Sequence, residues 1–263
     1  MRCQIEGVGI VAPGLPDWSS ARPCLAGDSI WQPGALGRVV APDLPRTEAR
    51  RATQVVHLSM TAAAQAMAAA EPPDTAMPSV WSSADGDLIG LERTCLALAE
   101  DPPWASPHRF QNSVHNTPAG YWSIATGCRG PSTALAGGGD SFVAGLVEAM
   151  TLLTADGAER CLLVVYDEAS PPTLERVRPV AESFATALLL RADGNVGTPL
   201  ELRKAPASAT PTACEDAGLE RLRATNPAAR ALPLLCALAA GRAQTLVLPW
   251  NDTAYELQLG ESA

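Results

Sequence analysis

The fold of this chain is decided by residues 129–153, whose sequence is RGPSTALAGGGDSFVAGLVEAMTLL. The small residues 132–136 predict a short strand, and the three glycines after them predict a sharp turn. Residues 140–153 then predict a helix that is apolar nearly all round, which must be buried on most of its sides. A strand, a glycine turn and a buried helix in this order indicate one unit of a layered α/β fold.

The segments on either side extend this unit into a repeating pattern. Strands are predicted at residues 3–12, 79–82, 160–166 and 184–190, and helices at residues 47–70 and from Asp85 or Asp87 to residue 100. Residues 160–166 and 184–190 are apolar without alternation, which indicates a sheet covered on both faces. The order β-α-β-α-β-α-β-β predicts a mixed α/β layer fold, with irregular segments at residues 14–45 and 107–130.

The composition shifts after residue 194, so we predict a division into residues 1–194 and a C-terminal extension, residues 195–263. Residues 205–212 are rich in Ala, Pro, Ser and Thr, as is typical of a linker. Short helices are predicted at residues 220–230 and 233–241 and a hairpin from strands 244–248 and 255–259.

The composition excludes several classes of protein. Hydrophobic residues make up 47% and charged residues 18% of the 263 residues, which excludes a disordered chain. A net charge of -9 disfavours binding to nucleic acid or to an anionic membrane, and no apolar run approaches the ~20 residues that span a bilayer. Seven cysteines without CxxC spacing and three scattered histidines indicate no metal site and no cofactor. We expect a cytoplasmic protein with reduced cysteines, since no signal-peptide core is seen at the start.

Two stretches of the chain resemble a known family. Residues 113–124 (SVHNTPAGYWSI) and 129–132 (RGPS) resemble the run before the nucleophile in β-ketoacyl synthases of the thiolase superfamily. Weaker support comes from 7–13 (GVGIVAP), 50–53 (RRAT), 160–168 (RCLLVVYDE) and 183–190 (SFATALLL). The resemblance covers residues 1–191 and implies one N-terminal half of the thiolase-like fold, followed by a short extension.

The chain departs from the family at the nucleophile. In ketosynthases a cysteine stands at the strand-to-helix elbow, which falls on Gly139 in this sequence, and neither Gly138 nor Asp140 supplies a thiol. Asp140 would place a negative charge where an oxyanion must develop, and we interpret it as a helix N-cap. The family's two catalytic histidines belong to a second half that is missing, since His57, His108 and His115 all precede the elbow. The resemblance therefore implies a catalytically degenerate subunit without catalytic residues.

Such a subunit is similar to the chain-length factors of aryl polyene pathways. The resemblance implies a heterodimer with an active β-ketoacyl synthase, in polyketide or fatty-acid-like biosynthesis, in which the inactive subunit shapes the acyl or polyene pocket. It implies pairing through the strand before the elbow, formed by Ser132, Thr133, Ala134, Leu135 and Ala136. Candidate residues of the acyl pocket are His115, Tyr121, Trp122, Phe142 and Leu146. An acyl carrier protein could meet the cluster of Arg46, Arg50 and Arg51.

Other functions stay open at this point. Cys128 with a nearby His115 would form a minimal nucleophile pair of a stand-alone acyltransferase. Gly139-Asp140-Ser141 resembles the nucleophile motif of GDSL-type ester hydrolases, although no histidine follows Ser141. The three glycines before a helix could cradle a phosphate, which Asp140 would repel. A homodimeric module that binds acyl chains or carrier proteins is a third class. His57 is interpreted as structural.

Overall fold

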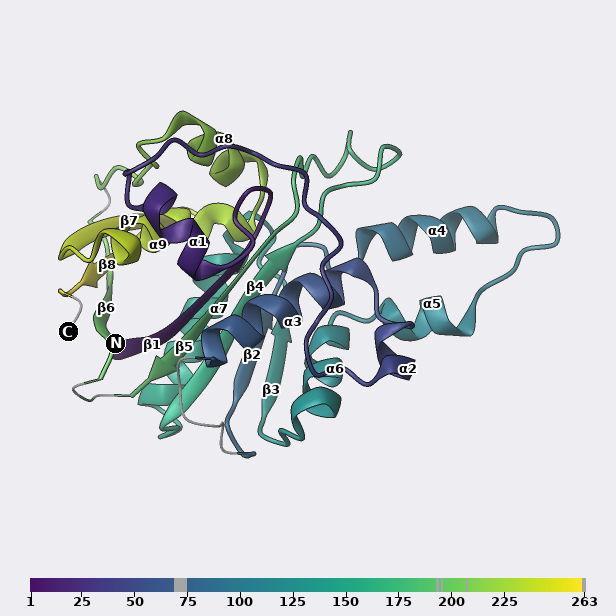
Figure 1. The fold of residues 1–263 in the computed structure, drawn as a ribbon, viewed down its shortest axis with the longest axis horizontal. Helices are drawn as coiled ribbons and strands as arrows, with labels where there is room; N and C mark the ends of the chain where they lie inside the picture. Colours follow the sequence, from purple (N-terminus) through teal and green to yellow (C-terminus); the bar gives the residue numbers. More distant parts are fainter. Residues whose placement is uncertain (69–74, 193, 195, 207, 262–263) are drawn as a thin grey trace.

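A mixed sheet with helices on both faces runs through the computed structural model of the chain (Figure 1). The structure describes residues 1–68, 75–192, 194, 196–206 and 208–261. Within them the sheet has eight strands, in the order β3-β2-β4-β5-β1-β6-β8-β7. The strands β2, β3 and β4 are parallel to one another, and the remaining neighbours pair antiparallel. The predicted mixed α/β layer fold is therefore confirmed.

The bounds of the elements are as follows. The strands are β1 (Arg2–Val11), β2 (Ser79–Ser82), β3 (Ser132–Leu135), β4 (Arg160–Asp167), β5 (Phe184–Arg191), β6 (Thr198–Lys204), β7 (Gln244–Trp250) and β8 (Thr253–Leu259). The α-helices are α1 (Trp18–Leu25), α2 (Arg46–Ala49), α3 (Gln54–Met67), α4 (Leu88–Leu98), α5 (Pro107–Asn112), α6 (Thr117–Thr126), α7 (Ser141–Thr154), α8 (Ala217–Thr225) and α9 (Leu232–Ala240). Two 3-10 turns, η1 (Gly138–Asp140) and η2 (Ala228–Ala231), precede α7 and α9.

The two faces of the sheet carry two separate cores. Alternate residues of β4 divide between them, since Leu163 and Val165 join the core under α7 whereas Leu162 and Val164 join the core under α3. This alternation is the period of a strand, and both sets are buried because each face is covered. The continuous apolar run that predicted a doubly covered sheet is explained by this arrangement.

Two glycines of β1 let α3 lie directly on the strand. A Cβ atom on Gly9 would stand 2.0 Å from the carbonyl oxygen of Ala62, and one on Gly7 would stand 1.9 Å from that of Ala66. Side chains at these positions would push α3 off the sheet, so the Gly-Val-Gly motif sets the distance between the two layers.

The C-terminal extension continues the sheet beyond β1. The strand β6 pairs with β1 from Arg2 to Ile5, and the hairpin of β7 and β8 pairs with β6. Residues of η2 and α9, among them Ala229, Leu232 and Leu235, belong to the same buried cluster as Phe142 of α7. The extension thereby covers the face of α7 that the sheet does not. A division at residue 194 stays a prediction.

Two predictions about local structure were wrong, and two elements were missed. Residues 107–130 hold the helices α5 and α6, because Pro107 and Pro118 lie in their first turns, where a missing N–H costs nothing. The helix predicted for residues 47–70 is two helices, and its end at residues 69–70 lies outside the described residues. Helix α1 and strand β6 were not predicted. The start of α4 was predicted correctly. Asp87 is its N-cap and accepts a hydrogen bond from Gly90 N at 2.8 Å.

Replacing Gly9 with alanine tests the close approach of α3 to β1. The added methyl group would overlap the Ala62 carbonyl, so we expect the free energy of unfolding to fall by about 2 kcal/mol or more in urea titrations. The control is Gly120→Ala on α6, where no atom lies within 4 Å of the added Cβ and helix propensity favours alanine. Equal stability of Gly9→Ala and wild type would show that this contact is not tight.

Candidate functional site

The elbow between β3 and α7 is formed without a nucleophile. The strand β3 ends at Leu135, the chain turns through Gly138 in a left-handed conformation (φ +54°), and α7 starts at Ser141. A Cβ atom built on Gly139 would stand 3.0 Å from Nη2 and 3.3 Å from Cζ of Arg230. The guanidinium group of Arg230, which belongs to η2, therefore occupies the space into which a side chain at the elbow would project.

The carboxylate of Asp140 holds this arginine in place. Its Oδ1 accepts a hydrogen bond from Arg230 Nη1 at 2.8 Å, and its Oδ2 accepts one from Asn251 N at 2.8 Å. The interpretation of Asp140 as a capping side chain is wrong, because it accepts no bond from the first turn of α7. The backbone explains this, since φ of -103° and ψ of 15° belong to the preceding 3-10 turn and not to the extended conformation of a capping residue. Asp140 instead connects the elbow to two segments of the C-terminal extension.

The two alternative nucleophiles are buried in structural contacts. The hydroxyl of Ser141 is fully buried and donates to Gly138 O at 2.8 Å. The thiol of Cys128 is buried and donates to Met77 O at 3.3 Å, at the end of β3 opposite to the elbow. His115 lies at the other end of the strand, where its Nε2 is 3.0 Å from Leu135 O, so the predicted Cys128–His115 pair is not formed. These contacts disfavour both stand-alone chemistries.

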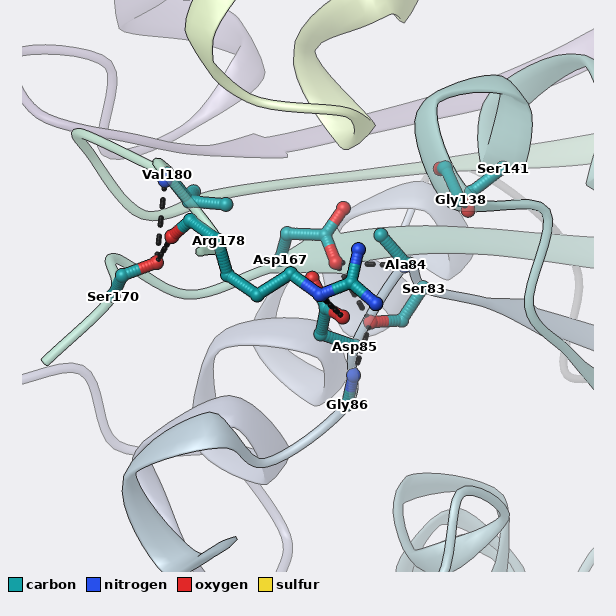
Figure 2. Close-up of polar contacts among 10 residues, drawn as sticks. All are labelled: Ser83, Ala84, Asp85, Gly86, Gly138, Ser141, Asp167, Ser170, Arg178 and Val180. Carbon is teal, nitrogen blue, oxygen red and sulfur yellow. Dashed lines mark hydrogen bonds and ion pairs between the residues drawn. The ribbon is translucent and has the colours of Figure 1, made fainter. Parts of the chain in front are cut away.

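A cavity of about 200 Å³ lies beside the elbow, and charged side chains line it. Figure 2 shows Arg178 reaching from the segment between β4 and β5 to Asp85, and 3.1 Å separate Arg178 Nε from Asp85 Oδ1. This segment is folded back on itself, since Ser170 N donates to Val180 O at 2.9 Å and Val180 N donates to Ser170 Oγ at 3.2 Å. Arg178 and Arg230 both line this cavity, so two guanidinium groups lie beside the elbow.

Behind this cavity Asp167 ends β4 with a buried carboxyl group. Its Oδ1 accepts hydrogen bonds from Ser83 Oγ and Ala84 N, each at 2.8 Å (Figure 2). Burial raises the pKa of Asp167 to about 7, and these two hydrogen bonds oppose that shift. Asn226 adds to the same frame by donating from Nδ2 to Asp167 O and Glu182 O. Asp167 therefore ties the ends of β2 and β4 together beside the cavity.

Four of the five candidate residues of the acyl pocket lie on opposite faces of the sheet, and the fifth, His115, lies at the end of β3. Tyr121 and Trp122 belong to the core under α3, with Trp122 against the ring of Trp81 at 6.1 Å between centroids. Phe142 and Leu146 belong to the core under α7 and are fully buried. The structure does not bring the two sets together within this chain, so their role in a pocket shared with a partner stays a prediction.

The predicted pairing strand is the free edge of the sheet. β3 is the first strand in the sheet order, and it ends at Leu135, one residue before the predicted end at Ala136. Ser79 N donates to Pro131 O, and Ser83 N donates to Leu135 O, so β2 uses the odd-numbered positions. In a parallel ladder alternate residues bond to the same neighbour, so the backbone groups of Ser132 and Ala134 face the open edge.

The remaining side chains to place are His57, the arginine cluster near α2, and two arginines that the sequence did not single out. His57 is structural as predicted, because Ala41 N donates to its Nδ1 at 3.2 Å and its Nε2 lies 3.1 Å from Ala49 O. Arg46, Arg50 and Arg51 are all exposed. Arg178 and Arg230 were missed, and no local pattern marks them, since Arg230 lies 90 residues from Asp140 in the sequence.

The comparisons with known proteins give a family and a fold. The model described as the β-ketoacyl synthase N-terminal domain matches residues 26–255, so the chain belongs to this family. The predicted resemblance is thereby confirmed, and with it the thiolase-like fold. The comparison with curated proteins gives no match.

Solved structures of similar fold include chains of ketosynthase complexes. A chain from the ketosynthase ApeO in complex with its chain length factor ApeC, from Xenorhabdus doucetiae, is 23% identical with a TM-score of 0.75, over 98% of this chain and 99% of that one. A chain of the ishigamide ketosynthase/chain length factor is 16% identical (TM-score 0.72, 98% and 99%). A chain of AntDE:AntF, a type II acyl-carrier protein in complex with its ketosynthase, is 12% identical (TM-score 0.76, 99% and 99%).

The described residues offer neither a cluster of metal ligands nor a membrane-spanning helix. Among those residues no group of three or more His, Cys, Asp and Glu side chains could hold a metal ion. No helix in the described part of the chain is long and apolar enough to cross a membrane.

A double-mutant cycle on Arg230 and Asp140 tests the connection between the extension and the elbow. Both side chains are partly exposed, so solvent screens the pair, and we expect a coupling of about 1 kcal/mol between Arg230→Ala and Asp140→Asn in urea unfolding. The matched control is the more exposed pair Arg2–Glu201, for which we expect a coupling near zero. A coupling at the elbow that is no larger than in the control would contradict this assignment.

The carboxyl group of Asp167 should make stability fall as pH rises. Its pKa is higher in the folded chain, about 7, than its ordinary value of 3.8, so folding favours the protonated form. That contribution is complete below about pH 4 and is lost as pH rises through 7. Between pH 5 and pH 8 the free energy of unfolding should fall by ~2 kcal/mol less in Asp167→Asn than in the wild type, measured by urea unfolding. Asp156→Asn, at an exposed carboxylate, should leave the profile unchanged, and an unchanged profile in Asp167→Asn would refute the prediction.

Proposed function

We propose that this chain is a non-catalytic subunit, a chain-length factor, that pairs with an active β-ketoacyl synthase and shapes its acyl pocket. One observation carries this proposal: the elbow position of the family is Gly139, and the guanidinium group of Arg230 fills the space of the absent side chain. Ketosynthase chemistry needs a thiolate at the positive end of the helix. Here that end carries no thiol and faces an Asp140–Arg230 ion pair.

The free edge of the sheet supports a partner at β3. The outward N–H and C=O groups of Ser132 and Ala134 offer a ladder that a second strand can complete, and unpaired edges of this kind are otherwise an aggregation hazard. The side chains on the strand are small, which lets a partner's backbone and helices approach. The relatives in the ApeO–ApeC and ishigamide structures are described as ketosynthase and chain length factor together, which favours a synthase as the partner.

An exposed apolar surface lies on the same side of the molecule. Of the twelve large apolar side chains that are exposed in the described chain, seven fall between residues 91 and 124: Leu91, Leu96, Leu98, Trp104, Phe110, Val114 and Ile124. They belong to α4, α5, α6 and their connections, and α4 and α5 project away from the chain termini (Figure 1). Exposed apolar groups in this number mark a protein-binding surface, and α6 packs on β2 next to the free strand.

An acyl carrier protein would then reach the complex through basic residues of this chain. Arg46, Arg50 and Arg51 are exposed around the connection of α2 and α3, where an acidic partner can meet them. The AntDE:AntF relative is described as an acyl-carrier protein in complex with its ketosynthase, which supports this part of the proposal for this chain.

Co-expression with an active synthase from the same organism tests the proposal. The chain should purify with the synthase as a 1:1 heterodimer, measured by size-exclusion chromatography with light scattering. Intact mass after incubation with an acyl thioester should show the acyl adduct on the synthase and none on this chain. A stable lone monomer that never co-elutes with any synthase, or an acyl adduct on this chain by itself, would contradict the proposal.

Substitutions at the two surfaces locate the partner. Ala134→Pro removes an outward N–H from β3, and Phe110→Ser removes an apolar side chain that is 69% exposed, so each should weaken the heterodimer by ~10-fold or more. The matched controls are Thr245→Pro on β7, the opposite edge strand, and Val177→Ser, which is 67% exposed outside the surface of residues 91–124. Dissociation constants from biolayer interferometry compare the four variants. Equal effects of the controls would show that pairing runs elsewhere.

A further inference from the structure

A second and larger cavity, of about 480 Å³, lies between the first turns of α3 and α4 and the helix α5. Its volume falls within the range of small-molecule sites in proteins. Four arginines and a histidine line it, namely Arg50, Arg51, Arg93, Arg109 and His108, together with the carboxyl groups of Asp87 and Glu168. We call it the α3–α4 pocket.

The inner wall of the α3–α4 pocket carries buried oxygens that lack partners. Glu168 is 2% exposed, and its Oε1 accepts a hydrogen bond from Ile89 N at 3.0 Å, but no group in the described structure donates to its Oε2. The same holds for Asp87 Oδ2 and for Thr53 Oγ1. Buried polar atoms in proteins are normally paired. Glu168 and Asp87 lie close enough to pair with each other, whereas nothing in the described structure pairs with Thr53 Oγ1.

The carboxyl group of Glu168 favours its protonated form. Burial raises the pKa of Glu168 to about 8, and the neighbouring Asp87 adds to the shift, whereas Ile89 N and Arg93 oppose it. The protonated Glu168 can donate to Asp87, which leaves Thr53 Oγ1 as the oxygen with the clearest need of a donor from a ligand.

The outer wall is positive. Arg50, Arg93 and Arg109 are exposed and form no ion pair within the described chain, and Arg51 reaches only Glu48, at 3.6 Å. Four guanidinium groups around one opening repel one another, and the cluster is notable in a chain with a net charge of -9. An arginine cluster that outnumbers its carboxylate neighbours binds phosphate well, because each planar group donates two parallel hydrogen bonds. Its total charge matches a dianion better than a single carboxylate.

We propose that the α3–α4 pocket binds a small phosphate monoester, with the phosphate held by Arg50, Arg93 and Arg109 and a hydroxyl or amide N–H of the ligand donating to Thr53. The proposal needs no residue of a synthase, since all of the pocket's residues belong to this chain. The pocket lies away from β3 and the elbow, but α4 and α5, which line it, also carry part of the proposed partner surface. It differs from docking of a carrier protein, because it requires the inner wall as well as the arginines.

Calorimetric titration of the whole chain with ribose 5-phosphate tests this inference. Ribose 5-phosphate should bind at one site, and both inorganic phosphate, which lacks the hydroxyl donors, and ribose, which lacks the anion, should bind ~10-fold or more weakly. The double variant Arg93→Ala/Arg109→Ala should weaken ribose 5-phosphate by ~10-fold or more. The matched control is Arg242→Ala, an exposed arginine just after α9, which should leave the affinity unchanged.

Thr53→Val separates a binding role from a structural one. Because Thr53 Oγ1 has no partner in the described structure, its loss should not lower the thermal unfolding temperature. It should reduce the affinity for ribose 5-phosphate to that of inorganic phosphate and leave inorganic phosphate unaffected. Absence of ribose 5-phosphate binding at about 10 mM, or equal affinity in the double arginine variant, overturns the site. Unchanged affinity in Thr53→Val overturns the role of the inner wall.

Discussion

The structure depends on covering a helix that is apolar on nearly every side. The sheet buries one face of α7 through β2 and β4, and a lone half of a thiolase-like fold would leave the other face in water. In this chain η2 and β7 take that place, and their apolar residues share one buried cluster with those of α9 and with Phe142 and Leu146. Burial of this area is the dominant stabilising contribution, at about 25 cal/mol per Å². The extension is therefore part of the core and not an appendage.

That packing has a direct consequence for chemistry. The turn η2 must lie beside the first residues of α7 in order to bury its alanines, and this brings Arg230 onto Gly139. The elbow thus carries no thiol, and the guanidinium group of Arg230 lies against the position that a side chain at Gly139 would take. A side chain at position 139 would require the guanidinium group of Arg230 to shift by a few tenths of an ångström.

Two neighbouring acids at the end of β4 serve different sites. Successive residues of a strand point to opposite sides, so Asp167 faces Ser83 and Ala84 near the elbow, whereas Glu168 faces Ile89 and the α3–α4 pocket. Burial raises the pKa of both carboxyl groups toward or above neutrality. A single dipeptide thereby organises the elbow on one side of the strand and the arginine-lined cavity on the other.

The sequence by itself determined the main strands, the buried helix after the glycines, the family and the missing thiol at Gly139. These follow from local patterns, because apolar runs, glycine turns and motif spacing are written along the chain. It did not reveal α5 and α6, whose polar and aromatic residues obscure helical periodicity, nor β6, which forms because β1 offers an edge. Only the tertiary structure brought Arg230 to the elbow and four arginines to one cavity. Both depend on contacts between segments far apart in sequence, and a charged side chain carries no local mark of the partner that packing will give it.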